Sequence, residues 1–182
     1  MTATTKPREV AVTFEPIDRE RLNALSAKGK ADHSAVRTVK CRTVAEGRRF
    51  RHLNYIRNLP AHIVDEPPQL LGDDTAPNPT EALLAALGTC VAVGIQANAV
   101  GRGWKVNGID LELEGDINIT SVWGTGDLSP KPLGLTAVRI KAHLDIDGPS
   151  AAELDELVAH AGKWSPVLNT FRNPVPVVVE RG

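Results

Sequence analysis

The chain has 182 residues, which is the length of one globular domain with a sizeable core. Its 21 Lys plus Arg nearly balance its 22 Asp plus Glu, and this balance argues against a nucleic-acid partner, which would need excess positive charge. Two cysteines are too few for a disulfide scaffold, and the N-terminal residues contain no apolar signal core, so we expect a cytoplasmic protein with reduced thiols.

The first third of the chain predicts a short helix followed by a hairpin. Asp18 is suited to cap an amphipathic helix, which we expect to end at Gly29. Residues 36–44 are rich in β-branched side chains and alternate in character, and the pattern resumes over residues 48–56 after a Glu-Gly turn at 46–47. We therefore expect two antiparallel strands here, followed by a loop-rich segment.

A long apolar helix is predicted next. Asn78 is a good N-cap, Pro79 suits the first helical position, and Gly101 is a fitting stop. Residues 82–100 carry no charge, and their length is close to what a membrane span needs. They are nevertheless rich in Ala and weakly hydrophobic, which favours the buried core helix of a soluble protein without a membrane partner.

The second half of the chain predicts two long strands, then helices. Residues 106–119 and 136–147 alternate apolar and polar side chains, as half-buried strands do. Ser150 begins a capping box, and Ser165, followed by proline, is an N-cap for a second, short helix. The valine-rich residues 175–180 predict a last strand.

The order of these elements indicates an α+β fold. Strands follow one another in pairs instead of alternating with helices, which favours mainly antiparallel sheets around the long central apolar helix. An apolar helix of this length is hard to cover within one small domain. We therefore expect a homodimer in which the helix packs against its copy.

The two cysteines are the first candidates for chemistry. Cys90 lies in the middle of the apolar helix, where most free cysteines are small buried hydrophobes. Apolar surroundings disfavour the thiolate, so a reactive Cys90 needs an Arg or Lys from elsewhere in the fold. Cys41 lies on the first strand, where Arg42 alternates away from it; the sequence leaves open whether the two cysteines come close enough for a disulfide.

Other polar residues of the helices have simpler explanations. Ser165 is suited to its capping role, and Glu81 is favoured at a helix start by the helix dipole. Nine residues separate Glu81 from Cys90, a rise of roughly 13.5 Å, so their side chains cannot touch directly. The histidines are scattered without a metal-ligand spacing and no phosphate-binding loop is present, so we expect neither a metal nor a cofactor.

The segment PNPTEALLAALGTCVAVGIQANAVGRGWKVNGIDLELEGDI resembles the OsmC/Ohr family, and so does the tail WSPVLNTFRNPVPVVVE. Members of that family have a Pro-Glu-containing turn, an Ala/Leu-rich helix with a cysteine, a glycine after the helix, and then strands. With the opening hairpin, the resemblance covers roughly residues 36–181. We accordingly divide the chain into an N-terminal extension over residues 1–35, a tail plus a short helix, and an OsmC-like domain over residues 36–182.

The resemblance implies an intertwined homodimer and thiol-dependent reduction of organic hydroperoxides. The peroxidatic cysteine of the family corresponds to Cys90, whose thiolate attacks the O–O bond and becomes a sulfenic acid. The resemblance also implies a supporting Arg from the first hairpin, for which Arg42 is the best match and Arg37 and Arg48 are alternatives. Glu81 is the nearest match for a glutamate at the helix start, which would orient the Arg.

The chain departs from the family at the resolving cysteine, whose position is taken by Ser165. A serine hydroxyl cannot form a disulfide, so either Cys41 substitutes or an external thiol resolves Cys90. The leading hypothesis is a cytoplasmic, homodimeric peroxidase with a single peroxidatic cysteine that an external thiol resolves. The alternatives are a non-catalytic protein that binds a small apolar molecule or lipid, and a redox sensor.

Overall fold

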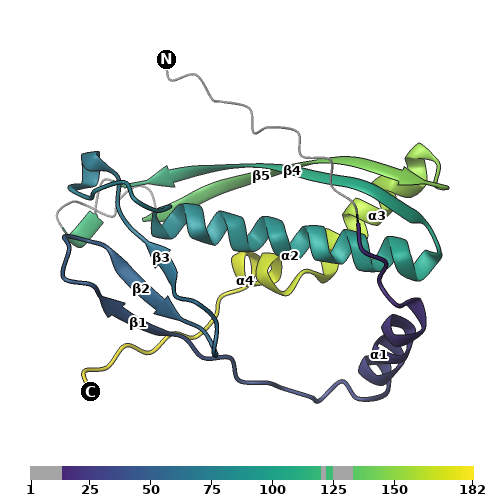
Figure 1. The fold of residues 1–182 in the computed structure, drawn as a ribbon, viewed down its shortest axis with the longest axis horizontal. Helices are drawn as coiled ribbons and strands as arrows, with labels where there is room; N and C mark the ends of the chain where they lie inside the picture. The colour runs from purple at the N-terminus through teal and green to yellow at the C-terminus, as the bar shows by residue number, and fades with distance from the viewer. Residues whose placement is uncertain (1–13, 120–121, 125–132) are drawn as a thin grey trace.

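The fold is built around one long helix that runs along a curved two-stranded sheet (Figure 1). The computed structural model describes residues 14–119, 122–124 and 133–182. In chain order the helices and strands are α1 (Arg19–Ala31), β1 (Arg42–Ala45), β2 (His52–Tyr55), β3 (His62–Val64), α2 (Pro79–Arg102), β4 (Lys105–Asn118), β5 (Gly134–Asp147), α3 (Ala151–Trp164) and α4 (Pro166–Arg172), with 3₁₀ turns at Pro68–Leu70 and Val122–Gly124.

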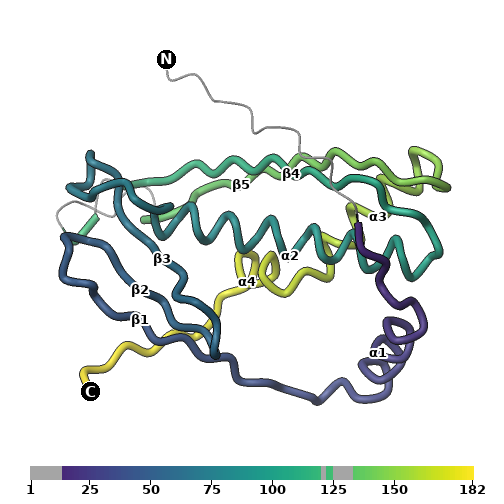
Figure 2. The backbone as a smooth tube through the Cα atoms, viewed as in Figure 1, coloured from purple at the N-terminus to yellow at the C-terminus, as the bar shows by residue number. Residues whose placement is uncertain are grey.

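Both sheets are antiparallel, as expected for the α+β class. The first has the strand order β1-β2-β3, and the second pairs β4 with β5. The three-stranded sheet lies near the N-terminal end of α2, and α1 lies toward the opposite end (Figure 1). The connection between them, residues 32–41, contains no helix or strand and can be followed as a long path in Figure 2.

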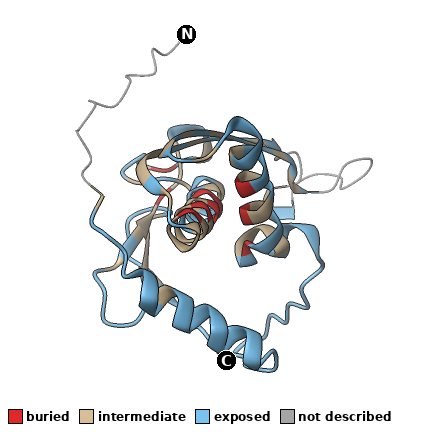
Figure 3. Cartoon of the chain, turned by 90° about the vertical axis from the view of Figure 1, so that its right-hand side faces the viewer, coloured by how far each residue is buried: buried red, intermediate tan, exposed pale blue. Residues whose placement is uncertain are grey.

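The core lies between α2, α3 and the two long strands. Leu87, Val91, Ile95 and Ala99 recur every four residues of α2 and therefore form one helix face, which is buried together with Leu157 and Ala161 of α3. These buried positions face each other across the two helices in Figure 3. The alternating apolar residues of β4 and β5 pack against this cluster and close it from the sheet side.

Several predicted boundaries are confirmed, because the capping residues occupy their expected positions. Asp18 caps α1, Asn78 caps α2 through a capping box, Ser150 caps α3 in the same way, and Ser165 caps α4. In each case the side-chain oxygen accepts a hydrogen bond from a backbone N–H of the first turn, which otherwise lacks a partner.

Other predicted boundaries were wrong. Gly29 does not end α1, which continues to Ala31, and α2 ends at Arg102 because Gly103, with φ of +83°, supplies the left-handed cap. The first strand is only four residues long, and β3 forms inside the segment expected to be a loop. Residues 175–180 form no strand in the described chain, because β-propensity needs a partner strand and these valines lie exposed without one.

The helix α2 is only partly covered by its own chain. By length and composition alone it could cross a membrane, yet it serves here as the central helix of the core. Leu83 and Val93 remain 45% and 58% exposed on its outer side. The extension helix α1 buries none of its residues and is joined to the end of α2 by Arg19, which donates hydrogen bonds to the Gly101 carbonyl at 3.2 and 3.3 Å.

Candidate functional site

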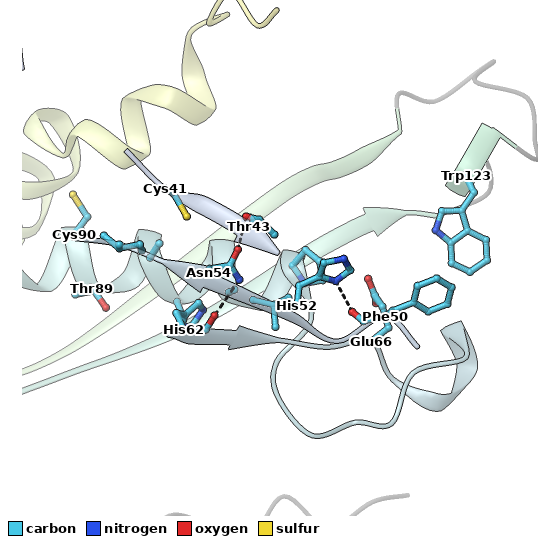
Figure 4. A pocket seen from close by; sticks show the side chains of 16 residues that line it. Cys41, Thr43, Phe50, His52, Asn54, His62, Glu66, Thr89, Cys90 and Trp123 are labelled. Atoms are coloured by element: carbon cyan, nitrogen blue, oxygen red, sulfur yellow. Dashed lines mark hydrogen bonds between the residues drawn. The ribbon is translucent and has the colours of Figure 1, made fainter. Parts of the chain in front are cut away.

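A cavity of about 1010 Å³ lies between the first half of α2 and one face of the β1–β3 sheet (Figure 4). The helix contributes small residues, so its wall is smooth and apolar, whereas the sheet contributes most of the polar groups. The lining residues are Cys41, Thr43, Phe50, His52, Asn54, Ile56, His62, Val64, Glu66, Pro79, Ala82, Ala85, Ala86, Thr89, Cys90 and Trp123.

The thiol of Cys90 is held by a serine at the start of α4. The Ser165 hydroxyl donates a hydrogen bond to the Cys90 sulfur at 3.1 Å, and its oxygen accepts one from the Leu168 N–H at 3.2 Å. Ser165 is only 3% exposed, and Cys90 is half-buried. The structure thus brings into hydrogen-bond contact two residues that lie 75 positions apart in the sequence. From the sequence, Ser165 was expected only to cap a helix and to stand where the family has its resolving cysteine.

Cys41 lines the same cavity as Cys90, directly before β1. Both cysteines are free thiols. Arg42 points away from Cys41, as the strand alternation predicts, and its guanidinium lies over the Tyr55 ring at 4.8 Å from the centroid. Cys41 and Cys90 therefore line the same cavity, whereas Arg42 is not among the described residues that line it.

The other predicted supporting residues also lie outside the cavity lining in this chain. Glu81 completes the capping box of α2, where its carboxylate accepts a hydrogen bond from the Asn78 N–H at 2.8 Å. Arg37 and Arg48 are exposed and are not among the residues that line the cavity. In the described chain, none of the three candidate arginines hydrogen-bonds Cys90 or Glu81, so their support of the thiolate stays a prediction.

Sequence reasoning missed the polar wall of the cavity. Thr43, Asn54 and His62 occupy matching positions on β1, β2 and β3. The Thr43 hydroxyl donates to the Asn54 side-chain oxygen at 2.7 Å, and the Asn54 amide donates to the His62 carbonyl at 3.1 Å. His52, also on β2, donates from Nδ1 to the Phe50 carbonyl at 2.7 Å. Alternation along the second strand places His52 and Asn54 on one face, but nothing in the sequence marks His62 as a strand residue.

The cavity has two chemically different ends. In Figure 4 the thiols of Cys41 and Cys90 lie toward one end, and Phe50, Glu66 and Trp123 lie toward the other. The rings of Phe50 and Trp123 pack with their centroids 5.6 Å apart. Burial, reinforced by the negative charges of Asp65 and Glu81, raises the pKa of Glu66. An elongated, mainly apolar molecule with one reactive end fits this arrangement.

Asp65 anchors the loop that carries Glu66. Its fully buried carboxylate accepts hydrogen bonds from the Thr75 hydroxyl at 2.7 Å, the Thr75 N–H at 3.1 Å and the Glu66 N–H at 2.9 Å. These bonds, that from the Thr75 hydroxyl first, lower the pKa of Asp65 to about 2, against the opposing effect of burial.

We predict an acid-sensitive fold because of this carboxylate. A depressed pKa means that Asp65 stabilises the folded chain fully above its ordinary value of 3.8, and that this contribution is lost as the pH falls from there toward about 2. Urea unfolding of Asp65→Asn should show a lower midpoint than the wild type at pH 6 and a smaller difference at pH 2.5. An equal difference at both pH values would contradict this assignment.

The model of the family described as OsmC-like protein matches residues 72–180. No curated protein matches the sequence. An organic hydroperoxide resistance protein OsmC from Legionella pneumophila superposes with a TM-score of 0.57 and 22% identity, covering 76% of this chain and 92% of that one.

Two further solved structures share the fold at lower identity. An OsmC-like protein from Mycoplasma pneumoniae has a TM-score of 0.63 and 16% identity, covering 76% of this chain and 89% of that one. An organic hydroperoxide resistance protein from Elizabethkingia anophelis has a TM-score of 0.56 and 18% identity, covering 76% and 91% of the two chains. At these identities the likeness concerns the fold.

Proposed function

Since the chain belongs to the OsmC-like protein family, we propose that it is a thiol-dependent peroxidase that reduces organic hydroperoxides at Cys90. The observation that carries this proposal is Cys90 itself, which lines a large, mainly apolar cavity and whose sulfur accepts a hydrogen bond from a buried hydroxyl. Two proteins of the same fold, from Legionella pneumophila and Elizabethkingia anophelis, are named organic hydroperoxide resistance proteins, which adds support.

The proposed reaction needs only the thiol and two external reactants. The Cys90 thiolate attacks the terminal oxygen of ROOH, an S–O bond forms, the O–O bond breaks, and the leaving alkoxide takes a proton from water to give ROH. Cys90 is thereby oxidised to the sulfenic acid. An external thiol then forms a mixed disulfide with release of water, and a second equivalent of thiol regenerates Cys90.

The cavity favours an organic hydroperoxide over hydrogen peroxide. The wall formed by α2 presents alanines at 82, 85 and 86, and aromatic rings close the far end. Burying an alkyl or aryl group against such a wall releases water and contributes binding free energy that hydrogen peroxide has no group to gain. The shape and polarity of the walls therefore support an organic hydroperoxide as the substrate.

We also propose that Arg42 and Glu81 support the thiolate, and that Cys41 substitutes as a resolving thiol where no external thiol reaches the site. For Arg42 this role requires the guanidinium to leave the Tyr55 ring. For Cys41 it requires a movement within residues 32–41, which are free of helix and strand. The uncovered outer side of α2 further supports a homodimer, which we propose to be cytoplasmic.

A second candidate function is favoured by the same cavity and by the serine at position 165. A cavity of about 1010 Å³ is large enough to hold a drug-sized apolar ligand, and a non-catalytic relative would keep it without a second cysteine. In that case native mass spectrometry of the purified protein should show a retained apolar molecule, and Cys90→Ala should retain it equally well.

The proposed function is tested by the consumption of cumene hydroperoxide. Reduced protein with excess dithiothreitol should consume cumene hydroperoxide catalytically, and at equal concentration faster than it consumes hydrogen peroxide. If the protein consumes no cumene hydroperoxide and mass spectrometry finds Cys90 unoxidised, the peroxidase function is excluded. The ligand-binding function would then be the one to test.

A further inference from the structure

The contact between Ser165 and Cys90 suggests a role for the serine beyond capping. In the part of the chain that the structure describes, Ser165 is the one side chain that hydrogen-bonds the Cys90 sulfur, at 3.1 Å. Arg42, the leading candidate for a supporting cation, instead lies over Tyr55. The group placed to favour a thiolate at Cys90 is therefore a neutral hydroxyl.

The capping hydrogen bond uses the oxygen of this hydroxyl as an acceptor and leaves its proton available. The Leu168 N–H can only donate, so at 3.2 Å it occupies a lone pair of the Ser165 oxygen. The single hydroxyl proton is then free to point at the sulfur. A backbone donor, a hydroxyl and a sulfur thus form a chain in which each hydrogen bond polarises the next.

A thiolate benefits from this arrangement more than a thiol does. A hydrogen bond to a charged acceptor is stronger than one between neutral groups, and Ser165, being 3% exposed, is shielded from competing water. Among the described residues that line the cavity, no other polar side chain hydrogen-bonds Cys90. In this structure Ser165 is therefore the hydrogen-bond donor to Cys90 among the described residues, whereas the support proposed for Arg42 and Glu81 requires a rearrangement.

We propose that Ser165 is a catalytic residue whose hydroxyl donates to the Cys90 sulfur and holds it as the thiolate that attacks the hydroperoxide. The inference deepens the proposed function and rests on it for the peroxide step. In that step Ser165 keeps its proton: the S–O bond forms, the O–O bond breaks, the alkoxide is protonated by water, and the same hydroxyl then donates to the sulfenic acid. Ser165 thus has a role of its own in the peroxide step, different from that of a resolving cysteine.

The test compares three variants by site-resolved alkylation of Cys90 with iodoacetamide from pH 5 to pH 10. Ser165→Gly removes the hydroxyl with little loss of capping strength, because glycine is itself tolerated as an N-cap. Ser165→Thr keeps a hydroxyl. Ser150→Gly is the matched control, because Ser150 caps α3 in the same way, with its oxygen accepting from the Glu153 N–H. Peptide mapping separates Cys90 from Cys41.

We expect Ser165→Gly to slow alkylation of Cys90 at pH 7 by about tenfold and to move the rate profile up by about one pH unit. Ser165→Thr and Ser150→Gly should keep the wild-type profile, and urea unfolding should show that every variant is folded. The other ionisable side chains that line the cavity, His52, His62, Glu66 and Cys41, are the same in all variants, so comparison at matched pH removes their contribution.

The outcomes separate this inference from the function on which it rests. An unchanged profile in folded Ser165→Gly would overturn the role of the serine, whatever the wild type does with peroxide. A shifted profile in a protein that consumes no cumene hydroperoxide would overturn the peroxidase but retain Ser165 as the donor to the thiolate. A shift of equal size in Ser150→Gly would show that the change in the alkylation profile comes from losing a helix cap. That result would also overturn the proposed role of Ser165.

Discussion

Replacing Cys90 by serine should abolish the consumption of cumene hydroperoxide. The reaction needs a nucleophile that can accept an oxygen atom and return to its reduced state, and among the described residues that line the cavity only the two cysteines have this chemistry. Of these two cysteines, Cys90 is the one whose sulfur accepts a hydrogen bond from the Ser165 hydroxyl. We expect Cys90→Ser to lose at least about a thousandfold in rate, to the level of dithiothreitol alone, as measured by peroxide assay.

The matched control is Cys41→Ser, which removes the other thiol of the same cavity. It should still be oxidised at Cys90 by a single equivalent of cumene hydroperoxide, because the first step does not involve Cys41. A Cys90→Ser protein that remains active while Cys41→Ser is inactive would assign the peroxidatic role to Cys41 and contradict the proposed mechanism.

Gly72→Ala should have the largest effect on stability. A Cβ at residue 72 would lie 1.7 Å from the Glu66 carbonyl oxygen and 2.2 Å from its carbon, and both are backbone atoms that cannot rotate aside. The Gly72 N–H is also fixed by a 3.1 Å hydrogen bond to the Pro67 carbonyl. We expect a loss of about 3 kcal/mol or more in the free energy of unfolding, measured with urea.

Gly101→Ala is the contrasting substitution. A Cβ at this helical position meets no atom within 4 Å, so alanine should leave the stability unchanged or raise it by up to about 1 kcal/mol.

Because Gly72 closes the loop that carries Glu66, Gly72→Ala should also lower the affinity of the cavity for apolar probes. A Gly72→Ala protein as stable as Gly101→Ala would show that the loop is not packed as described.

Helices were predicted better than strands, and the reason is local. A helix start depends on a capping residue and its first turn, so Asp18, Asn78, Ser150 and Ser165 were identified from the sequence alone. A strand depends on a partner supplied from elsewhere. The segment at 36–41 alternates like a strand and remains unpaired, whereas His62–Val64 forms one although its surroundings are rich in proline.

The candidate site shows the same division. The alternation of the first strand predicted that Arg42 faces away from Cys41, whereas the role expected of Cys90 came from the family resemblance. The contact between Cys90 and Ser165 was not predicted, because it joins the middle of one helix to the start of another and depends on how α2 and α4 pack. Long-range packing of this kind leaves no periodic signal in the sequence.

The most direct test of the account is the intact mass of the reduced protein after one equivalent of cumene hydroperoxide, under anaerobic conditions and with a sulfenic-acid trap such as dimedone. We predict one rapidly trapped adduct, which peptide mapping assigns to Cys90 and which Cys90→Ser lacks. A protein with no adduct and no change in mass after minutes of exposure would contradict a peroxidatic thiol at this site.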